Sequence, residues 1–125
     1  MICRALASMV FCGAALSAAA AEDAPLWEGY WSPNAAWCAR AGDVGEQTPD
    51  WYGREGLFGL EWSCDIAAVS ETGVGNSWAL KLQCLDAGYA YSDAQILLVT
   101  PDDRLQIIDE NGFAADLVRC AAPQD

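Results

Sequence analysis

Apolar and polar residues alternate with a period of two along much of the chain, most clearly in LFGLEWSCDI at residues 57–66. Successive side chains of a β-strand point to opposite faces, so this alternation predicts one half-buried strand. Glu61 and Asp65 belong to its polar half and are expected to point to water. The apolar half, which we expect to point inward, consists of Phe58, Leu60, Trp62, Cys64 and Ile66.

Other segments with this period are separated by turn-forming residues, and none shows a sustained helical period. Residues 32–56 are rich in Gly, Pro and Asp and are expected to be mainly loop, with a short helical turn at 34–39 and a short strand near Trp51. Asn111-Gly112 predicts a hairpin with a type I′ turn. Six to seven strands at short spacing predict an all-β fold, a small antiparallel barrel or sandwich. The longer strands are expected at residues 26–31, 57–69, 77–85, 89–100, 104–109 and 113–120.

The start of the chain has the features of a secretory signal peptide: Arg4, then an apolar run, then an alanine-rich cleavage site. The run is too short and too rich in alanine to favour a membrane-spanning helix. We therefore expect residues 1–21 to be removed after Ala20 or Ala21. Residues 22–125 would then form a single β domain, periplasmic or secreted, with no membrane insertion after cleavage.

Four cysteines remain outside the expected signal peptide: Cys38, Cys64, Cys84 and Cys120. An even number in a short exported chain predicts two disulfides, and four cysteines allow three pairings. We favour Cys38 with Cys64 and Cys84 with Cys120, which would tie an early loop to a central strand and the last strand to another. The wide cysteine spacing and the absence of histidine argue against a metal site, and we expect no cofactor.

The chain is strongly acidic, with a formal net charge of −12. Residues 22–125 keep five basic against eighteen acidic residues. This balance opposes nucleic-acid binding, which needs clustered Lys and Arg, and favours attraction to a cationic partner. Acidity that serves only solubility is the alternative. The oligomeric state stays open.

Catalytic chemistry has little support in the composition. Without histidine, and with each remaining cysteine expected in a disulfide, the usual nucleophile and base pairs are missing. Lys81, the only lysine, belongs to the polar half of an alternating segment, and eighteen carboxylates will form some close pairs by chance. We therefore expect no enzymatic activity.

Five of the six tryptophans fall into two groups. Trp62 and Trp78 alternate with polar residues and are expected to fill the core; Leu80, Leu82 and Cys84 share the face of Trp78. Trp27, Trp37 and Trp51 lie near the start or in the long loop, where they would either plug a barrel end or stack on a sugar or peptide. Trp37 and Trp51 are our candidate ligand contacts.

GYW at 29–31, GLEWSCDI at 59–66, Cys84 at the end of a strand that begins with Trp78, and LVRC at 117–120 together resemble small exported four-cysteine all-β proteins of Gram-negative bacteria. The resemblance covers most of residues 22–125, but its motifs are framework residues and imply no activity. The G-x-W opening also resembles that of small calycin-like barrels. Size, export and acidity are similar to those of periplasmic lysozyme inhibitors, although no inhibitory loop matches residue by residue.

These observations predict an exported, non-enzymatic, disulfide-stabilised β-domain that binds or inhibits a cationic protein or peptide. The alternative is a domain that binds a glycan or another small ligand through Trp37 or Trp51. A structural envelope protein with no separable ligand is the third possibility.

Overall fold

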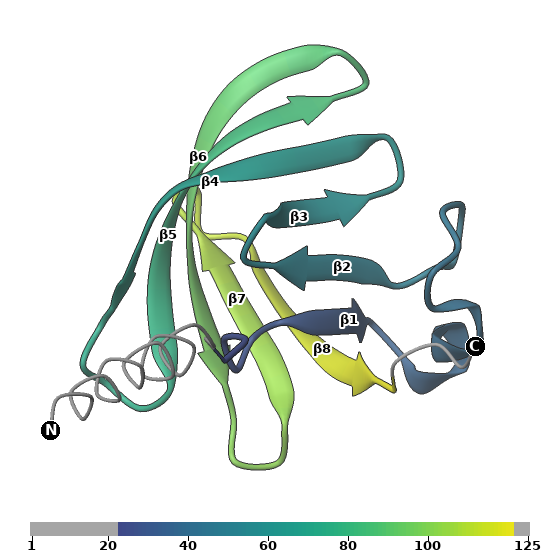
Figure 1. Cartoon of the computed structure of the whole chain (residues 1–125), viewed down its shortest axis with the longest axis horizontal. Coiled ribbons are helices and arrows are strands. Elements are labelled where there is room, and N and C mark those ends of the chain that lie inside the picture. Colours follow the sequence, from purple (N-terminus) through teal and green to yellow (C-terminus); the bar gives the residue numbers. More distant parts are fainter. Residues whose placement is uncertain (1–22, 122–125) are drawn as a thin grey trace, which may run out of the picture.

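The computed structural model describes residues 23–121, so the expected signal peptide at residues 1–21 lies outside the described residues. The described chain forms one closed barrel of eight antiparallel strands in sequence order (Figure 1). A single 3₁₀ helix, η1 (Ala35–Arg40), follows the first strand. The strands are β1 (Gly29–Ser32), β2 (Asp50–Gly53), β3 (Gly56–Gly59), β4 (Trp62–Glu71), β5 (Ser77–Asp86), β6 (Tyr89–Val99), β7 (Arg104–Asp109) and β8 (Ala114–Cys120).

The barrel closes where β1 pairs with both β2 and β8. Trp31 lies opposite Asp50 on β2 and opposite Arg119 on β8. The all-β class and the two disulfides are confirmed, and the alternatives of barrel and sandwich resolve to a barrel. The expected six to seven strands are too few, because residues 57–69, expected as one strand, cover most of both β3 and β4. The short strand expected near Trp51 is present as β2.

Residues 57–66 form a hairpin, so the prediction of a single strand was wrong. Strand β3 ends at Gly59 and β4 begins at Trp62, with Leu60 and the positive-φ residue Glu61 (φ 62°) in the turn. Gly59 lies opposite Trp62, so the inner face passes from odd-numbered to even-numbered residues across the turn. Phe58 and Leu60 are consequently 44% and 41% exposed.

The rest of that stretch follows the expectation. Cys64 is buried, while Trp62 and Ile66 are half-buried and pack against the core. Glu61 and Asp65 are exposed. The buried residue of β3 is Leu57, which lies opposite Cys64 on the same face.

The core fills the barrel with large apolar side chains from every strand. The predicted inner face of β5 is confirmed, because Leu80, Leu82 and Cys84 are buried and Trp78 packs against them. Trp27 is only 2% exposed, so it belongs to the core rather than to a binding surface. The remaining buried apolar residues are Trp31, Tyr52, Leu57, Cys64, Leu97, Val99, Leu105, Ile107, Leu117 and Cys120.

The disulfides join Cys38 to Cys120 and Cys64 to Cys84, so the pairing that we favoured was wrong. Cys64 and Cys84 lie directly opposite each other on neighbouring strands, with Cα atoms 4.0 Å apart. Helix η1 packs against β1 and β8, which brings the Cα of Cys38 within 5.2 Å of that of Cys120. The two bonds are typical of a protein in an oxidising compartment. Among the described residues no helix is long and apolar enough to cross a membrane.

The hairpin predicted at Asn111-Gly112 is present between β7 and β8, but its turn differs from the expected type. Gly112 has a φ of 86°, whereas Asn111 is not among the residues with positive φ. A type I′ turn needs positive φ at both central residues. That combination occurs instead between β5 and β6, at Ala87 (φ 50°) and Gly88 (φ 87°).

Candidate functional site

Three aromatic side chains form a row across the outer surface of β1, β2 and β3. Tyr30 lies opposite Trp51, and Trp51 lies opposite Phe58. Alternation places them on the outer face, because the residues that follow Tyr30 and Trp51 and the residue that precedes Phe58 are buried. The Tyr30 and Trp51 rings are in contact, with centroids 4.8 Å apart and planes tilted by 58°. We call Tyr30, Trp51 and Phe58 the aromatic row.

Two glycines allow the rings of Trp51 on β2 and Phe58 on β3 to lie close to the outer surface of the sheet. A Cβ on Gly53 would lie 2.7 Å from Nε1 of Trp51, so the indole occupies the space above this glycine. A Cβ on Gly56 would lie 3.2 Å from Cζ of Phe58. Both rings therefore lie back toward the β2–β3 turn, which leaves the other side of the row open to the loop described next.

Residues 41–49 form a loop that faces the aromatic row and encloses a pocket of about 260 Å³ with it. We call this the loop pocket. The loop is shaped by hydrogen bonds from Gly45 N to Thr48 Oγ1 (3.1 Å) and from Thr48 Oγ1 to Gly45 O (2.7 Å). Five residues of the loop line the pocket, and one of them is acidic. They are Gly42, Asp43, Val44, Thr48 and Pro49.

A second, more open pocket of about 530 Å³ lies on the other side of the Tyr30–Trp51 pair. Glu28, Gly29 and Arg119 line it together with the end of β8. The Arg119 guanidinium is already engaged, because it donates to the backbone oxygens of Leu26 and Glu28 at 2.7 Å each and to Asp103 Oδ2 at 2.8 Å. Tyr30 and Trp51 therefore form a ridge with a hollow on either side.

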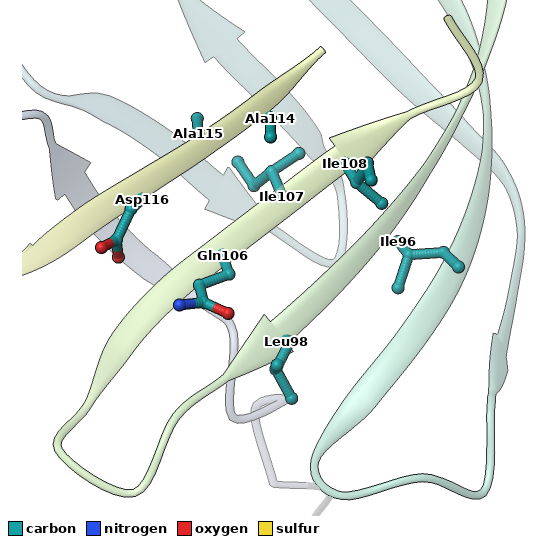
Figure 2. Close-up of a pocket in the computed structure, with 8 residues that line it drawn as sticks. All are labelled: Ile96, Leu98, Gln106, Ile107, Ile108, Ala114, Ala115 and Asp116. Atoms are coloured by element: carbon teal, nitrogen blue, oxygen red, sulfur yellow. The ribbon is translucent and has the colours of Figure 1, made fainter. Parts of the chain in front are cut away.

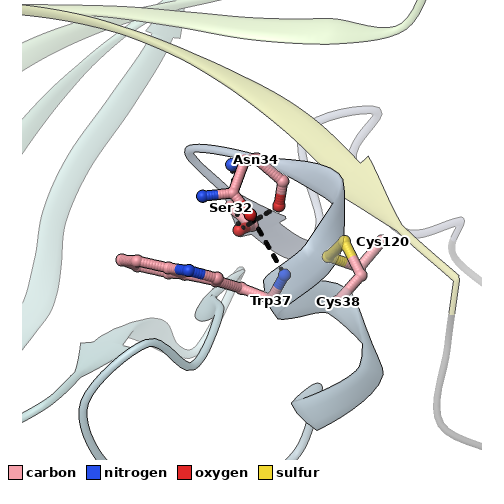
Figure 3. Close-up of a disulfide and its surroundings, with 5 residues drawn as sticks. All are labelled: Ser32, Asn34, Trp37, Cys38 and Cys120. Atoms are coloured by element: carbon pink, nitrogen blue, oxygen red, sulfur yellow. Dashed lines mark hydrogen bonds between the residues drawn. A yellow bond between two sulfur atoms is a disulfide. The ribbon is translucent and has the colours of Figure 1, made fainter.

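Trp37, the other candidate contact, lies on η1 and lines neither of these two pockets. Asn34 caps the N-terminus of the helix, and its Oδ1 accepts a hydrogen bond of 3.2 Å from Trp37 N. Figure 3 shows the Trp37 indole extending away from the Cys38–Cys120 disulfide. The structure thus places Trp51 in a candidate site and does not bring Trp37 into it, and both side chains are half-buried.

Sequence reasoning missed Tyr30, Phe58 and Asp43 as members of this site. The GYW and DWYG segments each carry an aromatic residue beside a buried one, which is a usable signal only if both are recognised as paired strands. Phe58 was assigned to the inner face because the turn at Leu60 and Glu61 was not recognised.

Polar groups also lie on the inner face of the barrel. Burial raises the pKa of Asp50 to about 6. Burial, assisted by the charges of Asp50 and Asp93, raises the pKa of Tyr52. Gln95 Nε2 donates to Asp93 Oδ2 at 3.4 Å, while Gln95 Oε1 is buried without a hydrogen-bond partner. The interior therefore contains a polar region among the apolar side chains.

No cluster of three or more His, Cys, Asp or Glu side chains within residues 23–121 is arranged to hold a metal ion. Comparison of the chain with protein families, with characterised proteins and with solved structures returns no match.

Proposed function

We propose that this protein is an exported, non-enzymatic binding domain for a cationic protein or peptide, and that a Lys or Arg side chain of the partner enters the loop pocket against the aromatic row. The observation that carries the proposal is that Trp51, Tyr30, Phe58 and Asp43 line one pocket. The formal net charge of −12 attracts such a partner to the surface.

The chemistry of the pocket suits a basic side chain that has an apolar stem. A cation over an aromatic ring contributes about 0.5–1 kcal/mol at an exposed site and about 2 kcal/mol when water is excluded. The Lys and Arg stems would pack on Val44 and Pro49, and the charged head would lie near Asp43. A volume of about 260 Å³ suits one side chain better than a folded segment.

The proposal is tested by calorimetric titration of residues 22–125 with lysozyme and with Lys-rich and Arg-rich peptides at low and high salt. We expect binding at low salt that weakens as salt screens the charges. Trp51→Ala and Asp43→Asn should each weaken binding by about fivefold to thirtyfold. Phe113→Ala is the matched control, because Phe113 is 66% exposed in the β7–β8 turn, away from the loop pocket.

Two results would contradict the proposal. The first is no salt-sensitive association with any of these cationic probes. The second is association that Trp51→Ala leaves unchanged although the variant unfolds at the same temperature as the parent protein. In the second case the acidic surface would attract partners without using the loop pocket.

A glycan is the second candidate ligand, because the Tyr30–Trp51 ridge between two hollows also suits stacking on a sugar ring. Neutral chitooligosaccharides would change the tryptophan fluorescence, and their binding would not depend on salt. The same Trp51→Ala variant would remove that response. A flat titration with peptidoglycan fragments and chitooligosaccharides would count against this alternative.

A further inference from the structure

The outer face of β5–β8 carries a row of apolar side chains. One row of side chains crosses all four strands in register: Ala79 lies opposite Ile96, Ile96 opposite Ile108, and Ile108 opposite Ala114. Ile96 and Ile108 are 43% and 48% exposed, and their buried sequence neighbours Leu97 and Ile107 show that they point outward.

Two hollows flank the ridge formed by Ile96 and Ile108, one on each side. The first hollow has a volume of about 450 Å³ and lies toward β8. It is lined by Leu98 of β6 and by Ala114 and Asp116 of β8 (Figure 2). The second hollow has a volume of about 310 Å³ and lies toward β5. It is lined by Ala79 and Lys81 of β5 and by Ala94 of β6. Both hollows exist because small alanines stand beside the large isoleucines. We call this surface the Ala–Ile–Ile–Ala face.

The charges on the Ala–Ile–Ile–Ala face nearly cancel. Arg104 forms an ion pair of 2.9 Å with Asp116 at one border. At the other border Lys81 and Glu110 line the same hollow. Asp109 lines that hollow too and adds a third carboxylate, which accepts hydrogen bonds from Asn111 N and Phe113 N within the turn. This face therefore carries two cations in a chain whose formal net charge is −12.

We infer that the Ala–Ile–Ile–Ala face binds a second copy of this chain in a two-fold dimer. A two-fold interface must be complementary to itself, and a ridge between two hollows meets that condition, since the ridge of each copy enters a hollow of the other. Lys81 of one copy faces Glu110 of the other. Because the chain is strongly acidic, two copies repel each other on average, and this repulsion is weakest at a nearly neutral face. The inference does not depend on the proposed function, and the aromatic row on β1–β3 is outside the interface.

Sedimentation velocity of residues 22–125 over a range of concentrations tests the inference. We expect a dimer that persists at high salt, because burial of apolar surface contributes most of the affinity. Ile96→Lys and Ile108→Lys should each raise the dimer dissociation constant by at least about tenfold. Leu60→Lys is the matched control, because Leu60 is 41% exposed in the β3–β4 turn.

A charge exchange tests the two-fold geometry itself. Lys81→Glu alone should weaken the dimer, and addition of Glu110→Lys should restore it, because each copy then presents the reversed pair to the other. A chain that stays monomeric at every concentration would overturn the inference. So would a dimer that the Ile96 and Ile108 substitutions leave intact, or a monomer that binds lipid vesicles through this face.

Discussion

The guanidinium carbon of Arg119 lies 4.3 Å from the centre of the Trp31 ring. Arg119 is on β8 and Trp31 on β1, so the contact joins the last strand to the first. Trp31 Nε1 in turn donates to Trp27 O at 3.0 Å. Gly29 leaves room for the guanidinium, because a Cβ at this position would lie 2.8 Å from Arg119 Nη1. The glycine and the tryptophan of the G-x-W sequence thus both lie against the Arg119 side chain.

Substitution of Arg119 by Met should lower the free energy of unfolding by about 2–4 kcal/mol, because two backbone carbonyls and the Trp31 ring lose a charged partner. Arg119→Lys should cost less, since it keeps the charge but not the planar fork. Gly29→Ala should also destabilise, and Gly29→Ala with Arg119→Met should cost less than the two separate losses together. Urea unfolding of the parent protein, the Arg119→Met and Gly29→Ala variants and the double variant measures this coupling. Additive losses would show that Gly29 and Arg119 act independently.

The two disulfides should differ in their effect on binding. The Cys38–Cys120 bond spans 82 positions and fixes η1, which leads directly into the loop of the loop pocket. Replacing both cysteines by serine should lower stability by about 4 kcal/mol and also weaken binding of the cationic peptides. The Cys64→Ser and Cys84→Ser pair should lower stability by about 3 kcal/mol and leave affinity unchanged at temperatures where the protein stays folded. Equal affinities for both double variants would show that the disulfide at η1 does not shape the loop pocket.

The sequence is informative about the long strands and less so about the short ones. Strand β5 was recognised because its alternation runs without interruption from Trp78 to Cys84, whereas β3 has only four residues, with glycine at both ends, and was merged with β4. The two-residue turn at Leu60 and Glu61 continues the alternation of apolar and polar residues on either side of it, so the alternation does not reveal the turn. The disulfide pairing and the aromatic row both depend on register between strands, which a single sequence does not determine when bulges such as the one between Ile66 and Ala68 shift it.

Glu61 should be replaceable by glycine with a gain in stability. Its φ of 62° is a left-handed conformation that costs a non-glycine residue about 1–2 kcal/mol, and its side chain is exposed. The backbone bond from Ala87 N to Glu61 O, 2.8 Å long, does not require the side chain. Because glycine also raises the entropy of the unfolded chain, we expect a net gain of about 0.5–1 kcal/mol in thermal unfolding. Ser70→Gly, one residue before the end of β4, is the control and should destabilise.

Asp50 should make the protein less stable as the pH rises through the weakly acidic range. Burial raises its pKa from 3.8 to about 6 in the folded state. Between these two values the unfolded chain loses the proton while the folded chain keeps it, so folding becomes less favourable as pH increases. Above about pH 6 both states are ionised and the penalty is constant. Because the carboxyl is partly solvated, we expect a loss of about 1–2 kcal/mol rather than the full linkage value.

Asp50→Asn isolates this contribution, because the amide has nearly the same shape and does not ionise. The variant should be more stable than the parent at pH 7 and about equally stable at pH 3.5, so the two stability curves should converge as the pH falls. Tyr52 and Asp93, the groups whose charges are coupled to this region, remain in both proteins. Asp65→Asn, on the exposed face of β4, is the control and should leave the pH dependence unchanged. A parent protein and an Asp50→Asn variant with parallel stability curves from pH 3.5 to pH 7 would mean that Asp50 is hydrated as well in the folded barrel as in the unfolded chain.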